Sequence, residues 1–141
     1  LNFILYLQEN QTGQETKLFE ITDTNVKQSV HVIKCSDITV IVKGKVGEIL
    51  LDQCKKVTLQ FDAALGSCNI VNSTKCHVHM VDGTPCVMID RSNGTEVYLS
   101  KDSEANTNIL TSGSTETSVY SAPLEAHGDG VRGSSGNLLC G

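Results

Sequence analysis

Residues 30–42 read VHVIKCSDITVIV, and residues 49–61 repeat the pattern nineteen positions later as ILLDQCKKVTLQF. Residues 68–80 (CNIVNSTKCHVHM) and 87–99 (VMIDRSNGTEVYL) repeat it twice more. Apolar residues fill equivalent positions in every copy, as in the column Val32, Leu51, Ile70 and Ile89. A fixed short period with apolar columns is typical of a solenoid, which offers long regular faces and no deep pocket by default.

Apolar and polar residues alternate within each copy, for example at Ile38, Val40 and Val42. This period of two indicates two short strands per repeat, separated by polar turns. The sequence therefore predicts an all-β protein, a parallel β-helix with turns of about 19 residues stacked about 4.8 Å apart. The expected complete turns are 26–44, 45–63, 64–82 and 83–101, with degenerate turns before and after them. An antiparallel β-sandwich is the alternative, but it does not require identity column by column.

The composition is that of one domain with its own core, at 141 residues with two prolines and no tryptophan. No apolar stretch reaches the roughly 18 residues of a membrane span. The apolar start, residues 1–7, lacks a basic lead, so we expect a first strand rather than a signal peptide.

The cysteines favour a reducing compartment. Cys35, Cys54, Cys68 and Cys76 fall at inward strand positions, where cysteine acts as a small buried hydrophobe. Reduced core thiols of a cytosolic protein are favoured over a disulfide framework, although Cys35 and Cys54 are stacked neighbours whose redox state stays open. The pair His77 and His79 has no second cluster of ligands, so we expect no metal or other cofactor. Three N-x-[ST] triplets, at Asn10, Asn72 and Asn93, would accept glycans only in the secretory route.

Charge is unevenly distributed along the chain. Residues 27–75 carry a net charge of +3, while residues 1–26 carry −3 and residues 76–141 carry −5. One predicted corner of the coil carries Lys55, Lys56 and Lys75, with Lys34 one turn away. Another predicted corner carries Lys43 and Lys45. A solvated solenoid edge explains such lysines in part, and docking of an acidic partner is the functional alternative. Nucleic acid is disfavoured, because the overall pI is low and no aromatic platform accompanies the lysines.

The motifs of an enzyme are missing from the sequence. Outward acids are scattered, with Asp52 and Asp90 two turns apart, and no phosphate loop, nucleophile elbow or metal-helix motif occurs. We therefore expect no enzymatic activity.

Several short segments of the sequence resemble the C-terminal, actin-binding CARP-repeat domain of cyclase-associated proteins. They are LYLQENQ (5–11), IKC (33–35), VKGK (42–45), LDQCKK (51–56) and VYLSKDS (97–103). The likeness runs from about Leu5 to Ser121. It implies a right-handed parallel β-helix that binds actin monomers, prefers ADP-actin and promotes nucleotide exchange. It also implies a homodimer made by exchange of C-terminal strands, and a cytoplasmic location at the actin cytoskeleton.

Actin monomers are acidic, so we expect the basic zone to be the docking surface, extended by Lys101 and Asp102. A related tubulin-cofactor domain carries a glutamine–arginine catalytic pair, but Arg91 stands outside such a motif, which argues against GTPase activation. The alternative function is that of a secreted β-helix that binds or processes carbohydrate.

The chain departs from the family pattern after Ser121. We expect a β-helix domain over 1–121 and a divergent Gly/Ser-rich tail over 122–141. This tail leaves open whether the strand-exchanged dimer forms. The sequence also leaves open whether the chain is a complete protein or a piece of a longer one.

Overall fold

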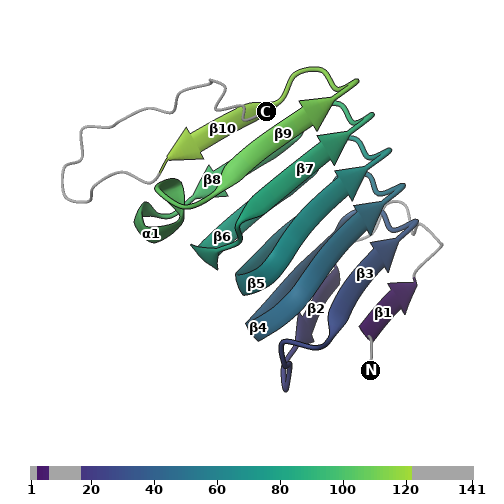
Figure 1. The fold of residues 1–141 in the computed structure, drawn as a ribbon. Helices are drawn as coiled ribbons and strands as arrows, with labels where there is room; N and C mark the ends of the chain where they lie inside the picture. The colour runs from purple at the N-terminus through teal and green to yellow at the C-terminus, as the bar shows by residue number, and fades with distance from the viewer. Residues whose placement is uncertain (1–2, 7–16, 122–141) are drawn as a thin grey trace.

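The computed structural model describes residues 3–6 and 17–121, and every strand pairing in it is parallel. The strands lie side by side in successive turns along one axis, and the short helix α1 lies near the C-terminal end of the described chain (Figure 1). The elements are β1 (Phe3–Tyr6), β2 (Lys17–Ile21), β3 (Ser29–Ile33), β4 (Ile38–Asp52), β5 (Thr58–Val71), β6 (His77–Gly83), β7 (Cys86–Asp90), β8 (Glu96–Leu99), α1 (Lys101–Glu104), β9 (Asn108–Ser112) and β10 (Ser118–Ser121).

The register confirms the predicted nineteen-residue turn. Val32 pairs with Leu51, Leu51 with Ile70, and Ile70 with Ile89, each on an adjacent parallel strand. All four side chains are buried. The chain is therefore a parallel β-helix, and residues nineteen apart lie directly above one another.

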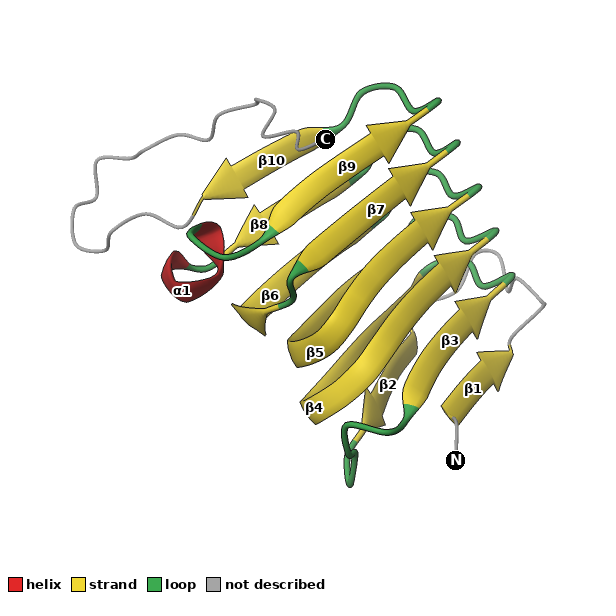
Figure 2. Cartoon of the chain, viewed as in Figure 1, coloured by secondary structure: helices red, strands yellow, loops and turns green. Residues whose placement is uncertain are grey.

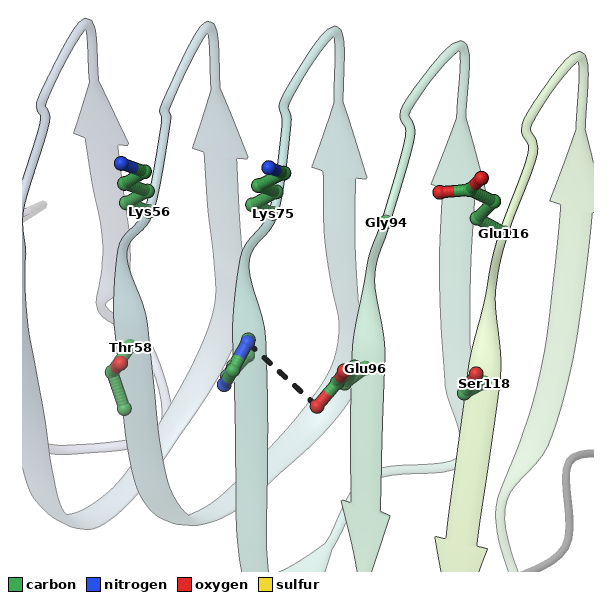
Figure 3. A pocket seen from close by; sticks show the side chains of 8 residues that line it. Lys56, Thr58, Lys75, Gly94, Glu96, Glu116 and Ser118 are labelled. Atoms are coloured by element: carbon green, nitrogen blue, oxygen red, sulfur yellow. Dashed lines mark ion pairs between the residues drawn. The ribbon is translucent and has the colours of Figure 1, made fainter.

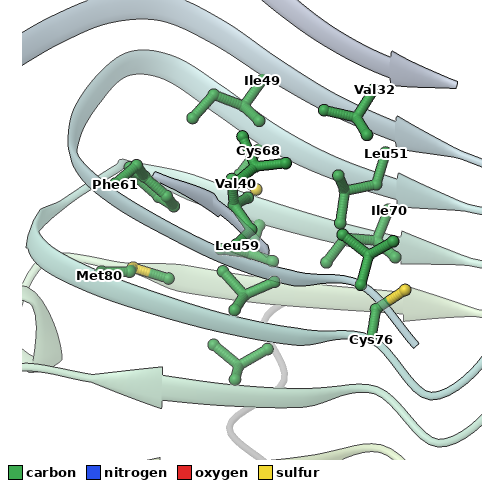
Figure 4. Packing of buried hydrophobic residues seen from close by; sticks show 14 of the residues in the cluster. Val32, Val40, Ile49, Leu51, Leu59, Phe61, Cys68, Ile70, Cys76 and Met80 are labelled. Carbon is green, nitrogen blue, oxygen red and sulfur yellow. The ribbon is translucent and has the colours of Figure 1, made fainter. Parts of the chain in front are cut away.

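Two flat walls enclose the core. The groove wall, which borders a surface groove, consists of residues 17–21, 38–42, 58–61, 77–80, 96–99 and 118–121. The opposite wall consists of residues 3–6, 29–33, 48–52, 67–71, 86–90 and 108–112. Inward side chains from both walls form one apolar cluster (Figure 4). Val42, Phe61 and Met80 stack in register within it, and Phe61 is fully buried. Alternation along each strand thus decides which residues fill the core and which face outward.

The first corner joins the opposite wall to the groove wall through residues 34–37, 53–56, 72–75, 91–94 and 113–116. Figure 2 shows these loops in green, stacked along one side of the coil. Each loop holds two residues with positive φ, such as Gln53 (56°) and Lys56 (57°) in the second one. Hydrogen bonds between turns hold this conformation, including Lys56 N–H to the Thr74 carbonyl (2.9 Å). Because the loops are alike, side chains at this corner also form columns.

The second corner consists of residues 43–47, 62–66 and 81–85. A break between two short strands was expected there in each repeat, but it is absent from two of these turns. β4 and β5 run uninterrupted from the groove wall to the opposite wall. The register between β4 and β5 shifts twice, once between Val42 and Lys45 and once between Val46 and Glu48. Gly44, within the first shift, has a φ of 93°. Bulges of this kind bend a strand without ending it, so the backbone turns the corner while still hydrogen-bonded.

A polar ladder runs through the buried side of the first corner. The hydroxyl groups of Ser73, Ser92 and Ser114 accept hydrogen bonds from the backbone N–H of the residue one turn below, at 3.1–3.2 Å. The thiols of Cys35 and Cys54 occupy the same column and donate to backbone carbonyl groups. The predicted stacking of Cys35 and Cys54 is confirmed. Ser73 and Ser92 continue the same column, and the column satisfies backbone groups where the strands stop.

The terminal turns are irregular, as expected. Cys86 pairs with Asn108 and Glu96 with Ser118, so the offset rises from 19 to 22 where α1 is inserted. The expected first strand is confirmed over Phe3–Tyr6. The predicted tail, residues 122–141, lies outside the described residues.

Candidate functional site

An open groove runs across successive turns where the first corner meets the groove wall. It has a volume of about 510 Å³ and is lined by Lys56, Thr58, Lys75, His77, Gly94, Glu96, Glu116 and Ser118 (Figure 3). These residues belong to two parallel columns, one at the corner and one on the wall. The repeat itself therefore builds the groove, because each turn contributes equivalent positions to it.

The corner column supplies the exposed charges of the groove. Lys56, Lys75 and Glu116 are exposed, and Gly94 stands between Lys75 and Glu116 in the sequence of turns. The Lys75 N–H donates to the Asn93 carbonyl (2.8 Å), which holds this lysine in its left-handed conformation. Fixed backbones at each corner direct these side chains toward solvent over the groove.

The wall column holds an ion pair and a hydrogen bond that share one carboxylate. Glu96 Oε1 lies 3.7 Å from His77 Nε2 and accepts a hydrogen bond from the Tyr98 hydroxyl. This hydrogen bond, together with partial burial, raises the pKa of the Tyr98 hydroxyl to about 12. The tyrosine is therefore neutral and acts as a hydrogen-bond donor throughout the physiological range.

An aromatic ladder continues across the same wall. The rings of His79 and Tyr98 stack with centroids 4.3 Å apart and planes 2° apart, and those of Tyr98 and Tyr120 stack at 4.9 Å and 18°. Burial, and then the neighbouring His77, lower the pKa of His79. The ladder gives the wall a rigid, partly apolar surface beside the charged groove, and tyrosine is a favoured residue at binding interfaces.

The structure separates the eight residues predicted to bind a partner into two groups. Lys34, Lys55, Lys56 and Lys75 lie at the first corner, and only the last two line the groove. The others lie toward the second corner: Lys43 pairs with Glu20 (3.0 Å), Lys45 lines a smaller hollow of about 360 Å³, and Lys101 and Asp102 open α1. The groups lie at the two corners that bound the groove wall, so a partner that lies across this wall would contact both.

Sequence reasoning missed the histidines, Glu96 and the tyrosines as a group. A signal was present, since His77 and Glu96 are nineteen positions apart, as are His79 and Tyr98. Tyr120 follows Tyr98 by 22 positions, so the insertion that contains α1 hides it from a strict nineteen-residue comparison.

Two further cysteines, Cys68 and Cys76, are buried in the core. Burial raises the pKa of the Cys68 and Cys76 thiols to about 12, so both are uncharged and weakly nucleophilic at neutral pH. Arg91 pairs with Asp90 at 3.2 Å. Within residues 3–6 and 17–121, no three His, Cys, Asp or Glu side chains gather where they could hold a metal ion. The same part of the chain has no helix long and apolar enough to cross a membrane.

Fold and site together define a parallel β-helix protein whose open, charged face is suited to binding another macromolecule. Comparison with known proteins then identifies the family: the chain belongs to the adenylate cyclase-associated (CAP) C-terminal family, whose model matches residues 5–132. This match extends past Ser121 into the predicted tail.

Individual relatives agree with this assignment. The chain is 37% identical over 99 residues to the adenylyl cyclase-associated protein of Dictyostelium discoideum, covering 70% of this chain and 21% of that protein. It is 36% identical over 111 residues to adenylyl cyclase-associated protein 1 of Bos taurus, covering 79% and 23%. A crystal structure of cyclase-associated protein from Cryptosporidium parvum superposes with a TM-score of 0.70 at 27% identity, covering 82% of this chain and 72% of that one. The chain thus spans about a fifth of the length of these two full relatives.

Proposed function

We propose that this domain binds actin monomers, prefers the ADP-bound form and promotes exchange of its nucleotide. Family membership supports the proposal, as does the resemblance of the IKC, VKGK, LDQCKK and VYLSKDS segments to actin-binding CARP repeats. The domain would act as a regulator of filament turnover in the cytoplasm and not as an enzyme, because it makes no bond itself.

The groove is the observation that carries this proposal. It places Lys56 and Lys75 side by side above a flat wall, and the second group of lysines lies at the far side of the same wall. An acidic partner such as an actin monomer fits this distribution, since complementary charge steers association and fixes register. A flat wall also suits a large globular partner better than a small ligand.

The domain can promote nucleotide exchange if it binds one conformation of actin more tightly than another. A ligand shifts an equilibrium only by as much as its affinities for the two states differ. Binding across the groove wall would favour an actin conformation that releases ADP, and ATP would then bind from solution.

The double substitution Lys55→Ala with Lys56→Ala tests this surface. Both side chains are exposed, so we expect the free energy of unfolding to change by less than about 0.5 kcal/mol. Affinity for ADP-actin monomers should fall about tenfold, roughly 1.4 kcal/mol, and nucleotide exchange should slow with it. Fluorescence titration of labelled monomers measures the first effect and release of a fluorescent nucleotide the second.

Lys27→Ala is the matched control, because it removes an exposed lysine outside both predicted groups. It should bind as the parent does. A folded Lys55→Ala, Lys56→Ala protein with parental affinity would mean that these lysines form only a solvated edge.

Self-association belongs to the same proposal. We propose a homodimer made by exchange of C-terminal strands, with residues 1–121 as the β-helix unit and residues 122–141 as its tail. The residues that would make this contact lie beyond those described.

A further inference from the structure

Charge changes sign along the groove. In the corner column the order by turn is Lys56, Lys75, Gly94 and Glu116, and in the wall column it is Thr58, His77, Glu96 and Ser118. Figure 3 shows the corner column with Lys56 and Lys75 toward the N-terminal turns and Glu116 toward the C-terminal turns. The groove therefore has a basic end and an acidic end along the axis of the coil and is not uniformly basic.

The backbone fixes this order. Lys56, Lys75 and Glu116 have φ values of 57°, 54° and 51°, so they leave the chain in the same direction at successive corners. Gly94, with a φ of 76°, keeps the column but adds no side chain. A Cβ atom at Gly94 would approach Lys75 Cγ to 3.3 Å, so the glycine makes room for the Lys75 side chain.

The charges of the corner column do not neutralise one another, whereas His77 and Glu96 of the wall column pair with each other. The ion pairs found within the described part of the chain are Lys43–Glu20, His77–Glu96 and Arg91–Asp90. Lys75 and Glu116 lie two turns apart, roughly 10 Å at the usual strand spacing, and Lys56 lies roughly 14 Å from Glu116. Opposite charges held this far apart can each be paired by a partner.

We propose that the groove recognises the direction of an extended segment of its partner, with an acidic side chain over Lys56 and Lys75 and a basic side chain over Glu116. The inference rests on the proposed function and takes the segment to be part of the actin monomer. In an extended chain, side chains four residues apart face the same way and lie about 13 Å apart. A segment with an acidic and a basic residue at that spacing matches both ends, and a volume of about 510 Å³ suits a short segment.

Direction follows from repulsion as well as attraction. A segment placed the other way round would set acid against Glu116 and base against Lys75, and like charges across an interface suppress wrong arrangements. Glu116 is then a specificity-determining residue, although its negative charge has the same sign as the net charge of an acidic partner.

Glu116→Lys separates this inference from simple attraction of an acidic partner to a basic surface. Lysine already adopts the required backbone at Lys56 and Lys75, so the variant should fold. A uniformly basic surface predicts tighter binding of labelled ADP-actin monomers. The directional groove predicts an affinity at least fivefold weaker. The charge-neutral exchange of Lys75→Glu with Glu116→Lys should weaken binding at least tenfold.

Asp23→Lys is the matched control, because Asp23 has a φ of 60° and the substitution changes the net charge by the same amount away from the groove. It should bind as the parent does or slightly more tightly. If Glu116→Lys binds as tightly as Asp23→Lys, or the charge exchange keeps parental affinity, the directional groove is wrong while actin binding stands. If the parent itself does not bind ADP-actin, the proposed function fails and this inference fails with it.

Discussion

Replacing Phe61 with alanine is expected to lower the free energy of unfolding by about 3–5 kcal/mol. The ring is fully buried and stacks between Val42 and Met80 of the neighbouring turns. Truncation removes apolar contacts with both neighbours and leaves a cavity that a regular stack closes poorly. Chemical denaturation followed by circular dichroism measures the effect.

Gln60→Ala is the control for this experiment. Gln60 is the preceding residue of the same strand, but it is exposed on the groove wall. Its removal should change the free energy of unfolding by less than about 0.5 kcal/mol. A cost below about 1 kcal/mol for Phe61→Ala would contradict the core packing described above.

Ser73→Ala is expected to cost about 1–3 kcal/mol, because it breaks the buried polar ladder. The Ser73 hydroxyl accepts from the Cys54 N–H (3.2 Å) and donates to the Val71 carbonyl (2.8 Å). Alanine fills the space but leaves that N–H without its partner. Denaturation of the variant beside the parent gives the difference in free energy.

Ser73→Cys should lose less stability than Ser73→Ala. Cys35 and Cys54 occupy the same column, and their thiols donate to backbone carbonyl groups as the serine does. Ser67→Ala, a change on the outer side of the same turn, controls for the loss of a hydroxyl. Equal stability of Ser73→Ala and the parent would mean that the ladder contributes nothing to the fold.

The fold could be predicted because the stacking of successive turns restricts which residues can occupy equivalent positions. Strands nineteen residues apart share one environment, so Val32, Leu51, Ile70 and Ile89 must be apolar and similar in size. The continuous path of β4 around the second corner could not be predicted in this way. Polar residues there resemble a turn, and only the bulges beside Gly44 show that the ladder persists.

The candidate site was predictable only in part. Exposed lysines could be assigned to corners by counting, and Lys56 and Lys75 do line the groove. Counting also assigns Lys43 and Lys45 to a separate corner, but it does not show that the groove wall lies between the two corners, because the period says which residues stack and not how a turn is folded across its width. The partnership of Glu96 with Tyr98 depends on side-chain geometry within one strand, which the repeat does not encode.

We propose that the partner lies across the groove wall. Gln60 is exposed on this wall, in register with His79 of the ladder, and Met88 is exposed on the opposite wall. A photo-reactive benzophenone side chain placed at one position or the other compares the two faces directly.

Illumination of each labelled protein with ADP-actin monomers, followed by mass spectrometry of the cross-linked product, is the measurement. A partner that lies across the groove wall should give a covalent product with actin from position 60 and none from position 88. A product from position 88 with none from position 60 would contradict it and place actin on the opposite wall.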